Sequence, residues 1–306
     1  MEQLSVFCYG EVGVDNIIQA DQLPSPEIAV FPQAESYHIG GAAANTAVWL
    51  ARMGVPVGLS GNVIGDDLYG TQLQGWLAQH ERLNLTALEI VPGMTTPFTR
   101  AIVTPDGERS FLIFYYPQTP KSAFSLDMLK GAGFLALDLY GGPERVQAAR
   151  AAHNAGVRTT IGDVIWPEHE ALPFTDIVTN SGSYIRNIFP GADVHQHARS
   201  LQTINKGIVI TTDGGDEVFA IDQDGSAFVA HPPKVEVVDA TGAGDAFRAG
   251  LLYGLDKDLD LAASVCWGMA TGSLKVGHVG AATSLPTFAE IEILANQLIA
   301  RGVTAA

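Results

Sequence analysis

The sequence has few basic residues and few cysteines, and each shortage argues against a class of function. It holds 17 Lys and Arg against 33 Asp and Glu, a formal net charge of -16, and no Lys/Arg cluster occurs. Binding of nucleic acid through its phosphates is therefore disfavoured. The two cysteines, Cys8 and Cys266, lie in apolar surroundings without disulfide or metal spacing, so we expect buried free thiols.

The sequence also lacks an apolar run of 18 residues, and it does not open on the basic segment of a signal peptide. We therefore expect no membrane partner and a cytoplasmic location. With 306 residues, 47% of them hydrophobic and 16% charged, the chain can bury a large core. We expect a single domain over residues 1–306.

Two common nucleotide-binding motifs are absent. No G-x-x-x-x-G-K-[ST] occurs, so the chain is not a P-loop NTPase. The first predicted strand, residues 4–9, leads into Gly10-Glu11-Val12-Gly13 and not into G-x-G-x-x-G, which disfavours a dinucleotide-binding oxidoreductase. An acidic protein that binds a polyphosphate would need backbone N–H groups and a divalent cation.

Strand and helix patterns alternate along the chain, which predicts a mostly parallel sheet covered by helices on both faces. We expect strands at 4–9, 57–63, 134–139, 157–161, 176–179 and 207–211, and helices at 42–53, 67–79, 144–155, 244–255, 259–274 and 287–300. The last helix opens with a capping-box spacing, Thr287 and Glu290.

Two β-rich segments, 98–104 and 110–116, flank the turn signal Pro105-Asp106-Gly107-Glu108. Together with the alternating residues 28–38, they predict a small sheet separate from the main one. A second hairpin is expected from residues 217–221 and 227–230.

Residues 239–247, with the sequence DATGAGDAF, are the most informative stretch. Gly242, Ala243 and Gly244 form a small-residue turn at the start of a predicted helix, where free N–H groups can bind an anion. Asp245 lies in the first turn of that helix. A carboxylate beside an anion site is suited to take a proton from a hydroxyl that attacks a phosphate. The alternative is an Asp that only caps the helix.

This stretch resembles the DTGAGD signature of the ribokinase-like (PfkB) carbohydrate and nucleoside kinases. Residues 40–54, which begin Gly-Gly-Ala-Ala-Ala-Asn, and residues 64–70, IGDDLYG, resemble the same family in the same order and at about its spacing. The resemblance spans residues 6–286. It implies a ribokinase-like, doubly wound α/β sheet with a small β-sheet lid, which we place at about residues 15–38 and 95–118.

The resemblance also implies an activity, namely ATP- and Mg²⁺-dependent phosphorylation of a hydroxyl of a small sugar, ribose- or fructose-like, or of a ribonucleoside. Asp245 would be the general base, and Gly242, Ala243 and Gly244 would form the anion hole. The substrate-binding positions would be Asp15, Gly40, Gly41 and Asn45. The nucleotide-binding positions would be Asn180, Thr212, Gly214 and Thr241. Asp239, Thr241 and carbonyls near 277–284 resemble a monovalent-cation site for K⁺. In similar proteins the lids often pair to form a homodimer.

Two positions carry alternatives. The family usually has N-x-x-E after a strand, where the Glu orders water around Mg²⁺, but here Asn180-Ser181-Gly182-Ser183 places Ser183 at that position. A catalytically weak or regulatory ligand-binding protein is therefore the alternative function. Arg248 stands where many sugar kinases have a small or apolar residue. It either marks a similarity to a nucleoside-kinase subgroup or is a solvated helix residue.

Overall fold

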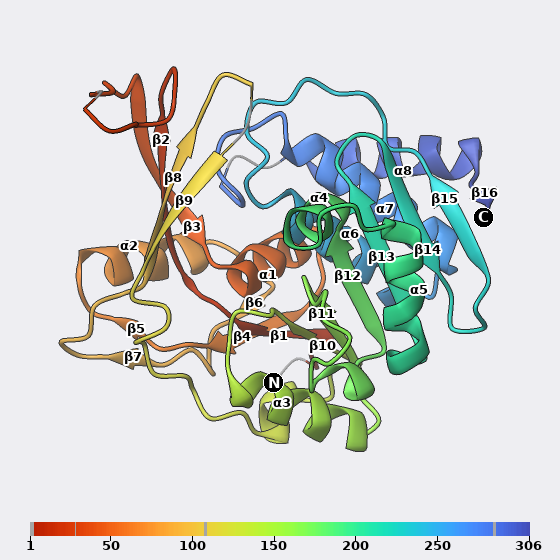
Figure 1. Cartoon of the computed structure of the whole chain (residues 1–306). Helices are drawn as coiled ribbons and strands as arrows, with labels where there is room; N and C mark the ends of the chain where they lie inside the picture. The colour runs from red at the N-terminus through yellow and green to blue at the C-terminus, as the bar shows by residue number, and fades with distance from the viewer. Residues whose placement is uncertain (1–2, 28, 107–108, 284–285) are drawn as a thin grey trace.

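The computed structural model describes residues 3–27, 29–106, 109–283 and 286–306 (Figure 1). Its largest sheet contains a parallel part made of β1 (Val6–Gly10), β4 (Val57–Gly61), β6 (Leu83–Asn84), β10 (Phe134–Leu137), β11 (Arg158–Gly162), β12 (Ile177–Ser181) and β13 (Ile208–Asp213). Three antiparallel strands extend it, β14 (Glu217–Ile221), β15 (Ala227–Ala230) and β16 (Thr304–Ala305). The order is β16-β15-β14-β13-β12-β11-β10-β1-β4-β6.

Helices cover both faces of this sheet, as the alternating pattern predicted. One face packs against α1 (Ala42–Arg52), α6 (Ala243–Asp256), α7 (Leu261–Lys275) and α8 (Phe288–Arg301), and the other against α3 (Pro143–Asn154) and α5 (Val194–Asn205). Successive side chains of a strand point to opposite faces. In β1, Val6 and Cys8 therefore enter the first core, and Phe7 and Tyr9 the second. The remaining helices are α2 (Leu68–Leu77), α4 (Gly182–Ile188) and two short 3₁₀ segments, Leu126–Leu129 and Leu172–Phe174.

A four-stranded sheet stands apart from the main one, at the left of Figure 1. Its order is β3-β2-β8-β9, from β3 (Ala34–Gly40), β2 (Gly13–Gln19), β8 (Phe98–Val103) and β9 (Arg109–Phe114). A further pair, β5 (Ile64–Gly65) and β7 (Ile90–Val91), lies near its base. The small sheet predicted from residues 28–38, 98–104 and 110–116 is thus present. Residues 107–108 of the expected turn lie outside the described part.

The doubly wound α/β architecture is confirmed, and the predicted strands and long helices appear within a few residues of the expected bounds. The capping box at Thr287 and Glu290 is formed, and both cysteines are buried and free. Helices α4 and α5 and the strands β2, β5, β6, β7 and β16 were not predicted. Helix α4 and the two-residue strands β5, β6, β7 and β16 are too short to show a period. In the described part of the chain, no helix has the length and apolar character needed to cross a membrane.

Asp67, the N-cap of α2, also binds the loop residue Thr96, so its loss should cost more stability than the loss of an ordinary N-cap. The Asp67 carboxylate accepts from the N–H of Gly70 at 2.9 Å and also from the N–H and hydroxyl of Thr96 at 3.0 and 2.6 Å. Among the described residues, the side chain of Asp193, the N-cap of α5, accepts only from the N–H of Gln196, at 3.0 Å. We expect Asp193→Ala to cost about 1 kcal/mol and Asp67→Ala about 2–3 kcal/mol. Urea unfolding of both variants checks this, and equal losses would contradict it.

Candidate active site

The predicted site lies where the parallel strands end, the usual place for a ligand in a doubly wound sheet. Polar side chains follow several strands directly, namely Glu11 after β1, Asp138 after β10 and Asp163 after β11, while Asn180 is the penultimate residue of β12. Helix α6 begins at the same edge, because its Arg248 bonds Thr179 of β12. The fold therefore brings distant parts of the chain to one place.

The start of α6 has the features of an anion site. Its N-cap, Gly242, has a φ of 73°, and a Cβ there would lie 2.4 Å from the Cβ of Ala281, so only glycine fits. The N–H of Ala243 donates to the carbonyl of Ala240 at 3.2 Å. The N–H groups of Gly242 and Gly244 donate to no described residue. Two of the three predicted anion-hole donors are thus free to bind a ligand.

Asp245 is held by two side chains, one from each of two helices. Asn45 of α1 donates its amide N–H to Asp245 Oδ2 at 2.9 Å, and Arg248 Nη1 lies 3.5 Å from Asp245 Oδ1. Burial raises the pKa of Asp245 to about 6, although Arg248 and Asn45 oppose the rise. The carboxylate is therefore ionised at neutral pH, but its pKa lies closer to neutral pH than its position at a helix N-terminus alone would suggest.

Arg248 is 4% exposed, so the interpretation as a solvated helix residue was wrong. It lies one turn after Asp245 on the same face of α6. Its Nε donates to the hydroxyl of Thr179 at 3.2 Å, and its Nη2 is 3.7 Å from Asp163 Oδ2. Asp163 also accepts from the hydroxyl of Tyr140, at 3.3 Å. Arg248 therefore links the predicted base to the ends of β11 and β12.

The predicted substrate-binding residues Asp15, Gly40, Gly41 and Asn45 lie on β2, on β3 and at the start of α1. Asp15 is 6% exposed, and a Cβ at Gly40 would lie 2.3 Å from its Oδ1. Gly41, the N-cap of α1, has a φ of 89°. Asn45 is also buried, and its Oδ1 has no partner among the described residues. Burial, with the charges of Asp245 and Asp239, raises the pKa of Asp15 to about 8. Asp15 is thus protonated at neutral pH and can both donate to and accept from a hydroxyl.

The predicted nucleotide-binding residues Asn180 and Thr212 lie on the adjacent strands β12 and β13, and the hydroxyl of Thr212 donates to the carbonyl of Asn180 at 3.3 Å. The side-chain amide of Asn180 is buried, and neither of its polar atoms has a partner within the described chain. Such a group is available to bind a ligand or a water molecule. Gly214 has a φ of 56° in the turn after β13. Ser183 is exposed, and its hydroxyl is 2.8 Å from that of Ser181.

Asp239 and Thr241 lie just before the predicted anion site. Asp239 is fully buried, and its carboxylate accepts from the N–H groups of Thr241 and Gly280, both at 2.8 Å. The hydroxyl of Thr241 is buried without a partner in the described chain. Lys275 Nζ donates to the carbonyl of Asp239. The expected cation position thus already contains an ammonium group, while residue 284 of the expected site lies outside the described part.

Four polar residues at this edge were missed in the sequence: Glu11, Asp138, Arg145 and Asp163. Arg145 Nε lies 3.1 Å from Asp138 Oδ1, with both side chains buried. The N–H of Glu11 also donates to Asp138. Burial and the charge of Asp138 raise the pKa of Glu11 to about 8. The signal that could have found the acidic residues is an acid placed directly after an apolar strand, as in Leu137-Asp138.

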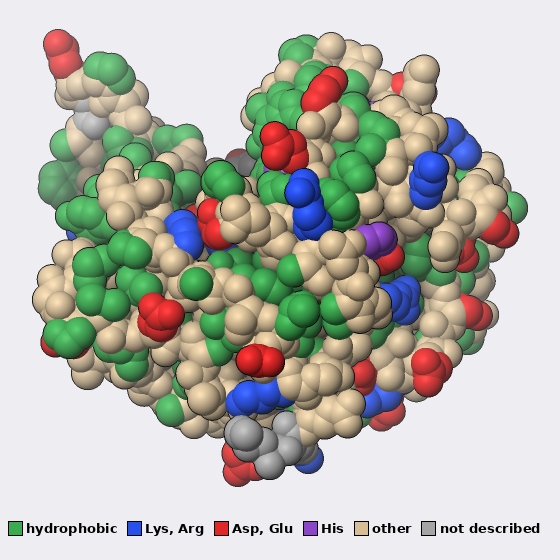
Figure 2. Space-filling model, turned by 90° about the horizontal axis from the view of Figure 1, so that it is seen from below, with side chains coloured by type: hydrophobic (Ala, Val, Ile, Leu, Met, Phe, Trp, Pro, Cys, Tyr) green, Lys and Arg blue, Asp and Glu red, His purple; other side chains and the backbone are tan. Residues whose placement is uncertain are grey.

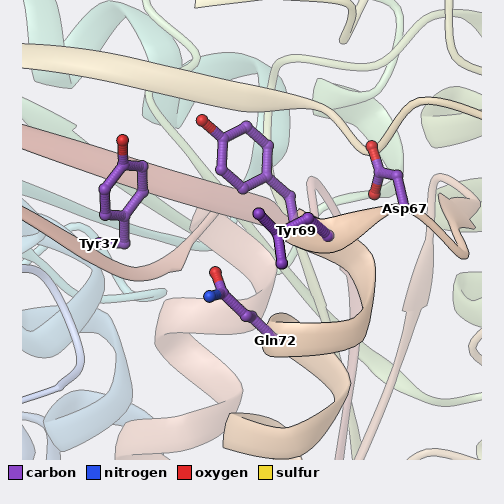
Figure 3. A pocket seen from close by; sticks show the side chains of 5 residues that line it. Tyr37, Asp67, Tyr69 and Gln72 are labelled. Atoms are coloured by element: carbon purple, nitrogen blue, oxygen red, sulfur yellow. The ribbon is translucent and has the colours of Figure 1, made fainter.

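A separate pocket of about 360 Å³ opens between β3 and α2 (Figure 3). It is lined by Tyr37, Asp67, Leu68, Tyr69 and Gln72. The rings of Tyr37 and Tyr69 face each other with centroids 5.7 Å apart. This pocket shares no residue with the predicted site, and the Asp67 carboxylate is already bonded to Gly70 and Thr96. We therefore place the chemistry at the strand ends and not in this pocket.

The fold, together with the comparisons with known proteins, defines the class as phosphotransferases with an alcohol group as acceptor. Residues 3–288 match the pfkB family of carbohydrate kinases, and the chain belongs to this family. It is 30% identical to the probable chloroplastic fructokinase-6 of Arabidopsis thaliana, over 92% of this chain and 80% of that protein. It is 25% identical to a nucleoside kinase of Methanocaldococcus jannaschii, over 95% and 96% of the two chains. The structure of Arabidopsis thaliana ribokinase complexed with ribose and ATP has the same fold, with a TM-score of 0.80, 20% identity, and coverage of 96% and 99%.

The Arg248 contact predicts a shift in pH dependence. As the predicted base, Asp245 must be deprotonated to accept a proton, so kcat/KM of the wild type should fall as the pH drops through about 6. Arg248→Gln removes the positive charge but leaves the burial and the negative charges of Asp138 and Asp163. The pKa of Asp245 should therefore rise, and the acid limb of the pH–rate profile should move to higher pH.

The matched control is Lys257→Gln, which removes a positive charge from an exposed position at the end of the same helix. Its acid limb should coincide with that of the wild type. An unmoved limb in Arg248→Gln, in a variant whose thermal unfolding is cooperative, would show that Arg248 does not control the ionisation of Asp245.

Proposed function

We propose that this protein is an ATP-dependent kinase that phosphorylates a hydroxyl of a small furanose sugar or of a ribonucleoside. The observation that carries the proposal is Asp245, an ionised carboxylate held by Asn45 and Arg248. It lies beside two N–H groups at a helix start that have no partner among the described residues. A base and an anion site in contact are what phosphoryl transfer requires of a protein, because most of its catalysis is positioning and charge stabilisation.

In the proposed reaction, Asp245 accepts the proton of the acceptor hydroxyl. The oxygen forms a bond to the γ-phosphorus of ATP, and the bond from that phosphorus to the β–γ bridging oxygen breaks, so that ADP leaves. The N–H groups of Gly242 and Gly244 would bind the oxygens of the transferred group, where negative charge is spread in the transition state. The products are the phosphorylated acceptor, ADP and the proton on Asp245.

The acceptor would bind between the small sheet and the strand ends. Asp15 and Asn45 both offer buried polar atoms there, and Gly40 and Gly41 permit a close approach of the backbone. Similarity to a fructokinase and to a nucleoside kinase supports either acceptor class. The burial of Arg248 does not choose between them, because its contacts are to Asp245, Asp163 and Thr179.

The nucleotide would bind beside β12 and β13. We assign four residues to nucleotide binding: Asn180, whose amide has no partner in the described chain, Thr212, Gly214 and Thr241. Mg²⁺ bound with the nucleotide would offset the charge of the phosphates. In the described residues, no group of three or more His, Cys, Asp or Glu could hold a metal ion. Mg²⁺ would then be held mainly by the phosphates, and Asn180, whose amide has no partner in the described chain, is the side chain that would bind its water ligands.

We further propose that residues 1–306 work as one domain in which segments 15–38 and 95–118 form a lid over the acceptor. The edge strand β9 leaves Phe111, Leu112 and Ile113 about half exposed. Figure 2 shows hydrophobic side chains gathered at the left of the molecule, the side on which Figure 1 places the small sheet. This apolar edge supports pairing of two lids in a homodimer.

The alternative, a ligand-binding protein without turnover, rests on Ser183 in place of the usual Glu. Acceptor-dependent release of ADP discriminates the two. A panel of ribose, fructose, adenosine and cytidine with ATP and Mg²⁺ should give turnover with at least one acceptor class. Calorimetric binding of an acceptor without any ADP release would favour the alternative.

The role of Asp245 predicts that Asp245→Asn lowers kcat by about 10²–10⁴-fold, the usual contribution of a general base. The amide keeps the shape and can still contact Asn45, so the affinity for ATP and the thermal unfolding midpoint should stay close to the wild-type values. Turnover within a few-fold of the wild type would show that Asp245 is not the base.

The assignment of Asp15 predicts a selective effect on the acceptor. Asp15→Ala should raise the KM of the acceptor far more than that of ATP, because the nucleotide-binding residues lie on β12 and β13. A deoxy analogue lacking the hydroxyl that Asp15 binds should be a poor substrate of the wild type, since the buried side chain is left unpaired. Equal changes in both KM values in Asp15→Ala would refute the assignment.

A further inference from the structure

Lys275, the last residue of α7, is a buried cation. Its side chain is 1% exposed, and its Nζ donates to the main-chain carbonyls of Asp239 at 2.5 Å and His278 at 3.0 Å. The same Nζ lies 4.0 Å from Asp239 Oδ2. Burial lowers the pKa of Lys275 to about 8, and the charge of Asp239 opposes this change. Lys275 is therefore charged at neutral pH, and oxygens surround it.

These oxygens belong to the position where the family resemblance implies K⁺. Two main-chain carbonyls and a carboxylate are hard oxygen donors of the kind that alkali cations bind. Here they face the ammonium of Lys275 instead. A second cation at the same oxygens would be strongly repelled, because like charges interact strongly in a buried site. The residues present therefore do not fit an added K⁺.

The ammonium lies behind the anion site. The Asp239 carboxylate accepts from the N–H groups of Thr241 and Gly280, both at 2.8 Å, and so joins two segments of the chain. One segment leads into Gly242, and the other leads into Ala281, which packs directly against Gly242. Lys275 thus neutralises the carboxylate that keeps both sides of the turn in place.

We propose that the Lys275 ammonium is a built-in substitute for a monovalent cation, so that this protein holds its anion-site turn without K⁺. This proposal rests on the proposed function in one respect, namely that the turn takes part in phosphoryl transfer. Its structural part, a tethered cation that takes the place of a free one, can be tested without turnover.

The first experiment uses the wild type. Acceptor-dependent ADP release and the thermal unfolding midpoint are measured in KCl and in choline chloride of equal ionic strength. The rate should differ by less than about twofold, the scale of a general salt effect, and the midpoint should not depend on the cation. A many-fold activation by K⁺, or a rise of the midpoint specific to K⁺, would overturn the proposal. This experiment needs no variant to fold.

The second experiment uses two variants that differ in the space they leave. Lys275→Ala removes the charge and opens room for an ion, whereas Lys275→Met removes the charge and fills the same space. Without K⁺, both should lose about 10-fold or more in kcat, since the anion-hole donors are no longer held in place. Added K⁺ should restore the rate and raise the unfolding midpoint of Lys275→Ala only.

Lys257→Ala, at an exposed lysine, is the control and should behave like the wild type. The proposal would be overturned if, without K⁺, both Lys275 variants turned over at the wild-type rate. It would also be overturned if K⁺ had the same effect on Lys275→Ala and Lys275→Met, or no effect on either. If the wild type shows no turnover with any acceptor, the proposed function fails. The unfolding measurements then still decide the role of Lys275.

Discussion

The contact between Asp245 and Arg248 is the interaction on which the site depends. A general base must be shielded from water and still be deprotonated, and these two demands conflict because burial favours the neutral acid. Burial and the negative charges of Asp138 and Asp163 raise the pKa of Asp245. The positive charge of Arg248 and the hydrogen bond from Asn45 lower it. The resulting value of about 6 leaves the proposed base ionised at neutral pH. It also suits proton transfer, which is most effective when the pKa of the base lies near the working pH.

The fold brings Asn45 to Asp245 by packing α1 against α6 at the carboxyl edge of the sheet. Asn45 and Asp245 are 200 residues apart in sequence, yet their side chains meet at 2.9 Å. Arg248 then ties α6 to β12 through Thr179. A second buried cation, Lys275, braces the turn that precedes α6. In a chain of net charge -16, the carboxylates at this edge are thus balanced locally by a few buried basic side chains.

Much of the fold could be predicted from the sequence because the strands of a doubly covered parallel sheet are continuous apolar runs and the long helices are periodic. The glycine-rich turn and Asp245 were also recognisable, since a small-residue turn before a helix has a local physical meaning. Helix α4 is too short to show a period. The electrostatics of the site could not be read in the same way, because they depend on contacts between distant segments.

Arg248 illustrates this limit. Its partners Thr179 and Asp163 come from the ends of two strands more than 60 residues earlier, and an isolated arginine in a helix looks like a solvated residue. Lys275 is a similar case, because the sequence resemblance implied a cation near Asp239 but not that a side chain of α7 would supply the charge. The raised pKa of Asp15 likewise follows from burial beside other carboxylates, which appears only once the chain is folded.

The most direct test of this account is the ionisation of Asp245 itself. The pKa of its side-chain carboxyl can be measured by NMR titration of the wild type with ¹³C-labelled aspartate, assigned through Asp245→Asn. We expect a value of about 6. A value near 3.8, the ordinary one for this side chain, would show that burial does not poise this carboxylate, and it would contradict the proposed balance between burial and Arg248.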